Sequence, residues 1–283
     1  MRLERQPGIE IIDRPDRFDW PFFEAWAAEE GWRVPPWELS LYGNELADCA
    51  FVGRGRDGTP LGFVTVCRHQ CSGWIGNLIV APHLRGEGVG RRLFRYAAEQ
   101  LAESGAASLW LTASVAGRSL YEAGGFRAVG SIERWIWQGR GDSTLPLPTS
   151  SAGDLQRLAR VDEAAWGDSR AGLLNLLARG GRVLTANGTV ALLQGGGGLR
   201  ILGPWLSADL CPRSNRTVLA AAMAACSGGE ELAIDLIGGS PIRILLAAVG
   251  FNRVGSTVLM VRGEPGTVKF GEIVALASLG SMG

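Results

Sequence analysis

Residues 77–101 read NLIVAPHLRGEGVGRRLFRYAAEQL, in which a strand-like apolar run, a glycine-rich turn and an amphipathic helix follow one another without a break. The turn has glycine at every second position, at Gly86, Gly88 and Gly90. Glycine lets the backbone turn sharply and come close to a ligand. The amides of such a turn and of the first helical turn are unpaired donors at the positive end of the helix dipole. Residues 85–90 are therefore predicted to hold a pyrophosphate.

Two common phosphate-binding loops do not match this stretch. A dinucleotide-binding fingerprint that begins at Gly86 needs its third glycine at position 91, where the chain has Arg91. A P-loop needs a Lys followed by Ser or Thr, and neither follows the last glycine. The remaining alternative is a plain connecting turn, in which three glycines would be costly in chain entropy.

Hydrophobic periodicity outside this stretch predicts alternating strands and helices, which is typical of an α/β chain with a mixed sheet. In the first half we expect strands over 9–12, 50–53, 61–68, 74–80, 108–113 and 132–137, and helices over 21–32, 90–104 and 116–123. In the second half we expect helices over 154–165, 170–178, 215–226 and 242–248, and strands over 182–186, 190–193, 199–202, 232–237, 256–261 and within 272–279. Residues 140–152 are rich in Gly, Ser, Thr and Pro, so they are predicted to link a first domain, 1–139, to a second, 153–283.

An internal repeat indicates that the two halves share one fold. Residues 125–131 read GFRAVGS, and residues 250–256 read GFNRVGS. The strands predicted before each block, 109–111 and 234–236, keep the same offset of 125 residues. Block, preceding strand and element order agree together, so we expect two related units in tandem.

The composition excludes several classes of protein. Lys plus Arg and Asp plus Glu both number 28, so the formal net charge is zero, and no general binding to nucleic acid or to a membrane is expected. The charged first residues lack the apolar core of a signal peptide. The five cysteines are too scattered for a disulfide framework, which favours a cytoplasmic protein. Cys67, His69 and Cys71 would share one strand face but offer a metal only three ligands, so no metal site is expected.

At this point the sequence resembles the GNAT N-acetyltransferase superfamily. The family's acetyl-CoA motif, Arg/Gln-x-x-Gly-x-Gly/Ala, is matched by Arg85, Gly88 and Gly90. Residues 77–82 resemble the family's preceding strand with its Val-x-Pro, and residues 120–126 resemble its Leu-Tyr-Glu-x-x-Gly-Phe. The resemblance covers about residues 9–138. It implies two tandem GNAT-like (acyl-CoA N-acyltransferase) domains, each a mixed sheet that splays open at its middle.

The resemblance also implies roles for individual residues. The cofactor would be acetyl-CoA, with the pantetheine arm paired to the strand and the Val80 amide donating to the thioester oxygen. Ser114 stands where the family often has an Asn that touches the cofactor. The cofactor-binding residues would be Leu78, Ile79, Val80, Arg85, Gly86, Glu87, Gly88, Val89, Gly90, Arg91 and Ser114.

Tyr121 would be the general acid, because a phenol of pKa about 10 can protonate a leaving thiolate; the alternative is a core aromatic side chain. The strand over 74–78 carries no acid or His to serve as the base. The candidates elsewhere are Glu24, Glu29, Glu45, Asp48 and His69, each of which could equally be a surface residue. Aromatic side chains over 26–42 would either stack on the acceptor or pack the core.

The second unit keeps the scaffold but has lost the chemistry. At the 125-residue offset, the loop becomes 210–215, which has no glycine, and Tyr121 becomes Leu246. One acetyl-CoA per chain is therefore expected, with the second unit shaping the acceptor cleft.

The sequence as a whole predicts an N-acetyltransferase acting by direct attack on a small-molecule amine, as a monomer or homodimer. The alternatives are a non-catalytic acyl-CoA sensor and a protein lysine or N-terminal acetyltransferase.

Overall fold

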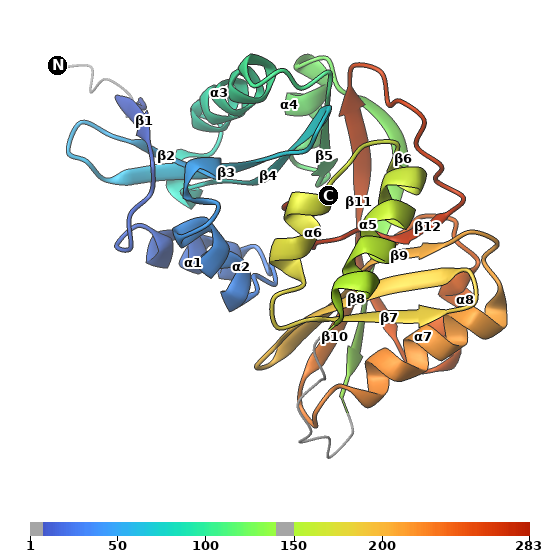
Figure 1. Ribbon diagram of the computed structural model, residues 1–283. Helices are drawn as coiled ribbons and strands as arrows, with labels where there is room; N and C mark the ends of the chain where they lie inside the picture. The colour runs from blue at the N-terminus through green and yellow to red at the C-terminus, as the bar shows by residue number, and fades with distance from the viewer. Residues whose placement is uncertain (1–7, 140–149) are drawn as a thin grey trace, which may run out of the picture.

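The computed structural model describes residues 8–139 and 150–283, and within them twelve strands form one mixed sheet (Figure 1). The strand order is β1-β2-β3-β4-β5-β11-β6-β10-β12-β9-β8-β7. This mixed α/β architecture confirms the predicted fold class.

Except for its last strand, β6, the first half builds the left side of the sheet in Figure 1. Its strands are β1 (Ile11–Asp13), β2 (Ala50–Arg54), β3 (Pro60–Arg68), β4 (Ser72–Val80), β5 (Ser108–Ala113) and β6 (Arg127–Gln138). Its helices are α1 (Trp20–Glu29), α2 (Pro36–Gly43), α3 (Val89–Glu103) and α4 (Arg118–Ala123), with short 3-10 turns η1 (Ala47–Cys49) and η2 (Pro82–Leu84). α3 has the predicted amphipathic pattern, and it buries Leu93, Phe94, Ala97, Ala98 and Leu101 against the sheet.

The second half follows with strands β7 (Arg182–Ala186), β8 (Thr189–Gly196), β9 (Leu199–Ser207), β10 (Glu231–Ile237), β11 (Asn252–Arg262) and β12 (Ile273–Ala275). Its helices are α5 (Ala152–Trp166), α6 (Ala171–Leu177), α7 (Pro212–Ala224) and α8 (Ile242–Ala248). β6 and β11 begin 125 residues apart, at Arg127 and Asn252, as the repeat predicts. Of the four glycines at 195–198, the first two end β8, where Gly196 pairs with Leu199, and Gly197 and Gly198 form the turn to β9.

The two halves exchange their last strands. β6 does not lie beside β5 of its own half; β11 stands between them, antiparallel to both. On its other side, β6 pairs with β10 over the whole length of β10, from Glu231–Gln138 to Ile237–Ile132. Each half therefore completes the sheet of the other, as the neighbouring β11 and β6 in the middle of Figure 1 show. The domain limits 1–139 and 153–283 stay a prediction, and most of the predicted linker lies outside the described residues.

Tryptophan side chains hold the halves together across this junction. Trp166, at the end of α5, lies 6.3 Å from Trp74 and 5.2 Å from Trp110, measured between ring centroids. All three are buried in one hydrophobic cluster that draws residues from both halves. Burying an aromatic side chain contributes about 1.5–3 kcal/mol, so this cluster disfavours separation of the halves.

The turn between β3 and β4 is tied to the second half by Asp168. Its carboxylate accepts the N–H groups of Cys71 and Ser72, at 2.8 and 2.7 Å, and the Ser72 hydroxyl at 2.6 Å. The expectation that Cys67, His69 and Cys71 share one strand face is wrong, because β3 ends at Arg68 and the last two residues lie in this turn. The Asp168 carboxylate accepts the hydrogen bonds that the turn's N–H and hydroxyl groups donate, and the backbone is not extended there.

None of the described helices combines the length and apolar character needed to cross a lipid bilayer.

Asp168→Asn is predicted to destabilise the fold. Burial raises the pKa of Asp168, but its hydrogen bonds to Ser72 and Cys71 outweigh that effect and lower the pKa overall. A lowered carboxyl pKa contributes stability that is present at neutral pH and lost as the pH falls below about 4. The amide cannot accept three bonds, so we expect a loss of about 1–3 kcal/mol at pH 7 by urea unfolding, and a smaller loss near pH 3.

Glu163→Gln, at an exposed position on α5, is the matched control. An Asp168→Asn variant as stable as this control at pH 7 would contradict the assigned role.

Candidate active site

The site opens where two parallel strands separate. β4 and β5 pair only at Ser72–Ser108, Gly73–Leu109 and Trp74–Trp110. Between the pairs Thr65–Gly76 and Phe63–Ile79, β4 uses one more residue than β3, and Asn77 takes a φ of +50°. This extra residue is a bulge, which bends β4. Residues 75–80 consequently have no strand partner on the β5 side among the described residues.

Alternation along β4 decides which backbone groups face the gap. Ala81 donates its N–H to the Leu61 carbonyl, at 3.0 Å, and so points toward the β3 side. Successive residues of a strand present their N–H groups to opposite edges, so the Val80 amide faces the gap. Leu78 shares that edge, and both residues are half-buried. Backbone donors in such a place need a partner, which a ligand can supply.

The glycine loop lies directly against the end of β4. Gly86 and Gly88 have φ angles of +86° and +84°, in the left-handed region that favours glycine. A Cβ added to Gly90 would lie 3.3 Å from Cγ2 of Val80. No side chain of the described residues caps α3, so its first amides stay available beside the gap.

A cavity of about 420 Å³ joins these parts. It is lined by most of the residues that the family resemblance assigned to the cofactor, together with the proposed acid: Leu78, Ile79, Val80, Arg85, Gly86, Gly88, Gly90, Arg91, Ser114 and Tyr121. Glu87 and Val89 do not line it: Glu87 is exposed, and the Val89 side chain is buried in the hydrophobic core. The Arg85 guanidinium lies 2.6 Å from the Glu30 carboxylate at the end of α1. The Ser114 hydroxyl accepts the N–H of Gly117 at 3.2 Å.

Tyr121 stands between this cavity and a smaller one, and lines both. Its ring packs edge-on against Phe94, with centroids 5.2 Å apart, and beside Phe126 at 6.4 Å. Burial raises the pKa of Tyr121 to about 12. The phenol therefore stays protonated at neutral pH and can act as a hydrogen-bond donor.

The smaller cavity, of about 140 Å³, contains a carboxylate that the sequence reasoning missed. Glu38, on α2, is 2% exposed, and its Oε1 accepts a hydrogen bond from the Asn77 amide at 3.3 Å. Burial raises the pKa of Glu38, while Ser281, Asn77 and Arg134 act in the opposite direction. Residues 34–42 are rich in Pro and aromatic residues and have no clear helical period, so α2 and its buried acid were not predicted. The one signal in the sequence was an acidic residue, Glu38, within an otherwise largely apolar segment.

The other candidate bases lie away from both cavities. Glu24, Glu29, Glu45 and Asp48 are exposed. His69 is buried, and burial lowers its pKa to about 3, so it stays neutral over the physiological range. Its Nδ1 lies 3.2 Å from the Ser72 hydroxyl.

The second half walls the smaller cavity. Arg134, on β6, is held by Asp235 of β10 through two hydrogen bonds of 2.7 Å. The Gly280 carbonyl accepts the indole N–H of Trp74 at 3.0 Å. A Cβ added to Gly76 would collide with the Ser281 backbone, so residues 279–281 pack directly under the bulged part of β4. Residues of the second half thus line this cavity, whereas its role as the acceptor cleft stays a prediction.

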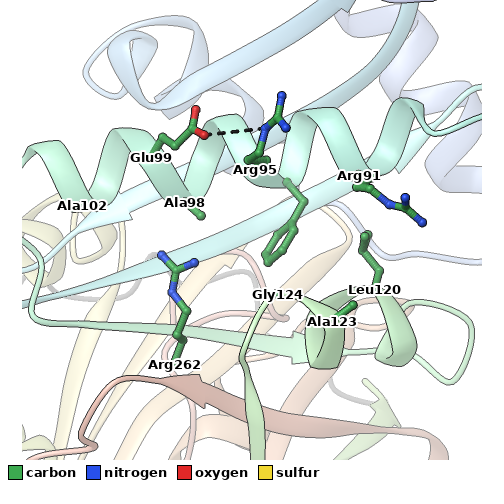
Figure 2. Close-up of a pocket in the computed structure, with 10 residues that line it drawn as sticks. Arg91, Arg95, Ala98, Glu99, Ala102, Leu120, Ala123, Gly124 and Arg262 are labelled. Carbon is green, nitrogen blue, oxygen red and sulfur yellow. Dashed lines mark ion pairs between the residues drawn. The ribbon is translucent and has the colours of Figure 1, made fainter.

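A groove of about 320 Å³ continues from the larger cavity, between α3 and α4 (Figure 2). Arg91 and Leu120 line both spaces. Figure 2 shows Arg262, from β11 of the second half, on the far side of the groove from α3. The guanidinium carbon of Arg262 lies 5.6 Å from the centroid of the Phe126 ring, a cation–π contact. On α3, Arg95 forms an exposed ion pair with Glu99 at 3.6 Å.

The corresponding gap in the second half is filled by the chain itself. β9 and β10 also pair in parallel over three residues and then diverge. β12 lies between them, pairing Ala275 with Leu236 of β10 and Ile273 with Leu206 of β9. Leu246, the counterpart of Tyr121, is fully buried in the core of that half.

Comparison with known proteins agrees with this geometry. Residues 13–126 match the Acetyltransferase (GNAT) family. Streptothricin acetyltransferase of Streptomyces lavendulae is 40% identical over 74 residues, which are 24% of this chain, and the chain spans 38% of the length of that relative.

Solved structures resemble nearly the whole chain. A candidate acetyltransferase from Pyrococcus horikoshii superposes with a TM-score of 0.75 at 20% identity, over 96% of this chain and 95% of the other. A GCN5-related N-acetyltransferase from Sphaerobacter thermophilus gives 0.64 at 16% identity, over 91% and 98%. A tandem GNAT protein from the clavulanic acid biosynthesis pathway gives 0.57 at 14% identity, over 90% and 98%. At these identities the likeness concerns the fold, which is that of a tandem pair.

Proposed function

Because the chain belongs to the acetyltransferase (GNAT) family through residues 13–126, we propose that it transfers the acetyl group of acetyl-CoA to the amine of a small molecule. The proposal rests on one observation: the edge of β4 that faces the gap has unpaired backbone donors directly beside the glycine loop. A pantetheine arm has amide groups that can pair with such an edge, and a pyrophosphate fits the amides of the loop.

Two residues would have defined roles in the transfer of the acetyl group, Val80 and Tyr121. When bound, acetyl-CoA supplies an activated thioester. The Val80 amide donates to its carbonyl oxygen, where negative charge grows during attack. Tyr121 donates to the sulfur as the thiolate leaves. Since the pKa of Tyr121 is about 12 and that of a thiol about 8.5, a hydrogen bond to the thiolate is favoured over full loss of the phenol proton.

The groove between α3 and α4 would take the other end of the cofactor. Phe94, Ala98 and Leu120 offer an apolar surface for a flat base, and Arg91 and Arg262 offer charge for a phosphate. Arg262 belongs to the exchanged strand β11, so the second half would contribute to cofactor binding.

We also propose that the protein acts in the cytoplasm, as a monomer or homodimer, with no nucleic-acid or membrane partner.

Tyr121→Phe is predicted to lower kcat by roughly 10- to 100-fold, because the leaving sulfur loses its hydrogen-bond donor. Affinity for acetyl-CoA should stay within about twofold, since the ring and its packing against Phe94 are kept. Thiol release measured with a panel of amines checks both numbers. Wild-type protein that binds acetyl-CoA but releases no thiol above hydrolysis with any amine would instead be a non-catalytic acyl-CoA binder.

Gly88→Asp is predicted to abolish cofactor binding, because it adds a side chain and a negative charge to the loop. Gly58→Asp is the matched control: Gly58 lies in the turn between β2 and β3, with a φ of +82° and no atom within 4 Å of an added Cβ, as at Gly88. Titration calorimetry should give one acetyl-CoA per wild-type chain and per control chain. Normal binding by Gly88→Asp would show that the cofactor lies elsewhere.

Arg262→Ala is predicted to weaken CoA binding by roughly tenfold, as expected for the loss of a charge-assisted hydrogen bond. CoA without its 3′-phosphate should bind the variant and the wild type about equally. Arg243→Ala, on the exposed face of α8, is the control. An equal loss for both ligands would mean that Arg262 acts through packing on Phe126 and not on a phosphate.

A further inference from the structure

The smaller cavity has an electrostatic character of its own. Its charged lining residues are Arg33, Glu38 and Arg134. Arg33 is paired with Glu231 at 2.6 Å, and Arg134 with Asp235 at 2.7 Å. Among the described residues, no cation lies within ion-pair distance of the Glu38 carboxylate. The cavity therefore contains one buried carboxyl group that is not paired with a cation.

Glu38 is faced from four elements. Its own helix brings the Tyr42 hydroxyl, β4 brings the Asn77 amide, β6 brings Arg134, and the last residues bring Ser281. Arg134 is the one cation among them, and its Nε and Nη2 are taken by Asp235. A buried carboxylate is expensive unless it is paired, so a cationic ligand would remove the largest unfavourable term in this cavity.

We propose that this cavity binds a small primary alkylammonium ion and that the Glu38 carboxylate holds it and takes its proton. The inference rests on the proposed function, because the cavity meets the cofactor cavity at Tyr121, Leu78, Ser114 and Trp32. A space of about 140 Å³ is close to the roughly 150 Å³ that holds one benzene molecule, so an acceptor of about six non-hydrogen atoms fits inside.

The proton and electron movements balance. One ammonium proton passes to Glu38, which leaves the nitrogen lone pair free. That pair forms the C–N bond, and the C–S bond breaks with its electron pair on sulfur. The second nitrogen proton reaches the sulfur by way of Tyr121, which gives up its own proton only as it takes the other, so that no phenolate is left behind. Glu38 gives its proton to solvent after the amide has left.

Two amines with the same carbon skeleton but different basicity test the role of Glu38. Ethylamine arrives protonated at pH 7.5, whereas 2,2,2-trifluoroethylamine arrives neutral because its fluorines withdraw electrons. Glu38→Gln keeps the acceptor oxygen for Asn77, so the fold and acetyl-CoA affinity should be unchanged. We expect kcat/KM to fall about 100-fold with ethylamine and less than about threefold with the fluorinated amine. Glu29→Gln, at an exposed position on α1, should change neither.

An equal loss with both amines would overturn the proton-accepting role and leave Glu38 a structural residue.

A second pair, propylamine and β-alanine, tests the acceptor class at one chain length. Propylamine should react at least tenfold faster, because the carboxylate of β-alanine meets a cavity that is already negative. A preference for β-alanine would overturn the class and make Arg134 a carboxylate binder. Thiol release with larger amines only would sink this inference alone, whereas no release with any amine would sink the proposed function as well.

Discussion

The loss of backbone pairing between β4 and β5 beyond Trp74 and Trp110 is the constraint on which the rest of the site depends. A parallel pair that stops after three residues leaves donors and acceptors along a half-buried edge, and those groups need partners. The bulge at Asn77 bends the strand away, and the glycine loop follows as soon as β4 ends. The glycine loop, the Val80 amide and Tyr121 therefore lie around one gap that the path of β4 creates.

The second half meets the same constraint in another way. Its strands β9 and β10 also diverge after three parallel pairs, but β12 enters the gap and pairs with both. That gap is closed by the chain, so it needs neither a glycine loop nor a phenol, and Leu246 fills the core instead. The exchange of β6 and β11 then makes the closed half indispensable. It supplies the strand beside β5 as well as Arg262, and it carries the Asp235 that holds Arg134.

Much of this could be predicted from sequence, because local periodicity and the glycine loop act over short distances. α3 and the two copies of the repeated block lie where expected. The strand exchange could not be predicted, since β6 and β11 begin with nearly the same residues and either could complete either sheet edge. Glu38 was missed for a different reason. α2 is only eight residues long and begins at Pro36 after Pro35, and its acid is buried by contacts from β4, β6 and the last residues, none of them near it in sequence.

Tyr121 and Glu38, the two groups proposed to move protons, are both buried, and burial suits one as a proton donor and the other as a proton acceptor. Burial raises the pKa of both Tyr121 and Glu38. For the phenol, the shift keeps the donor protonated until negative charge appears on the neighbouring sulfur. For the carboxylate, the raised pKa makes the group a stronger proton acceptor than a solvated carboxylate, which suits a base. Asn77, Ser281 and Arg134 limit that shift, and the second half supplies both Ser281 and the Asp235 that holds Arg134. The half without a glycine loop would in this way influence the strength of the base.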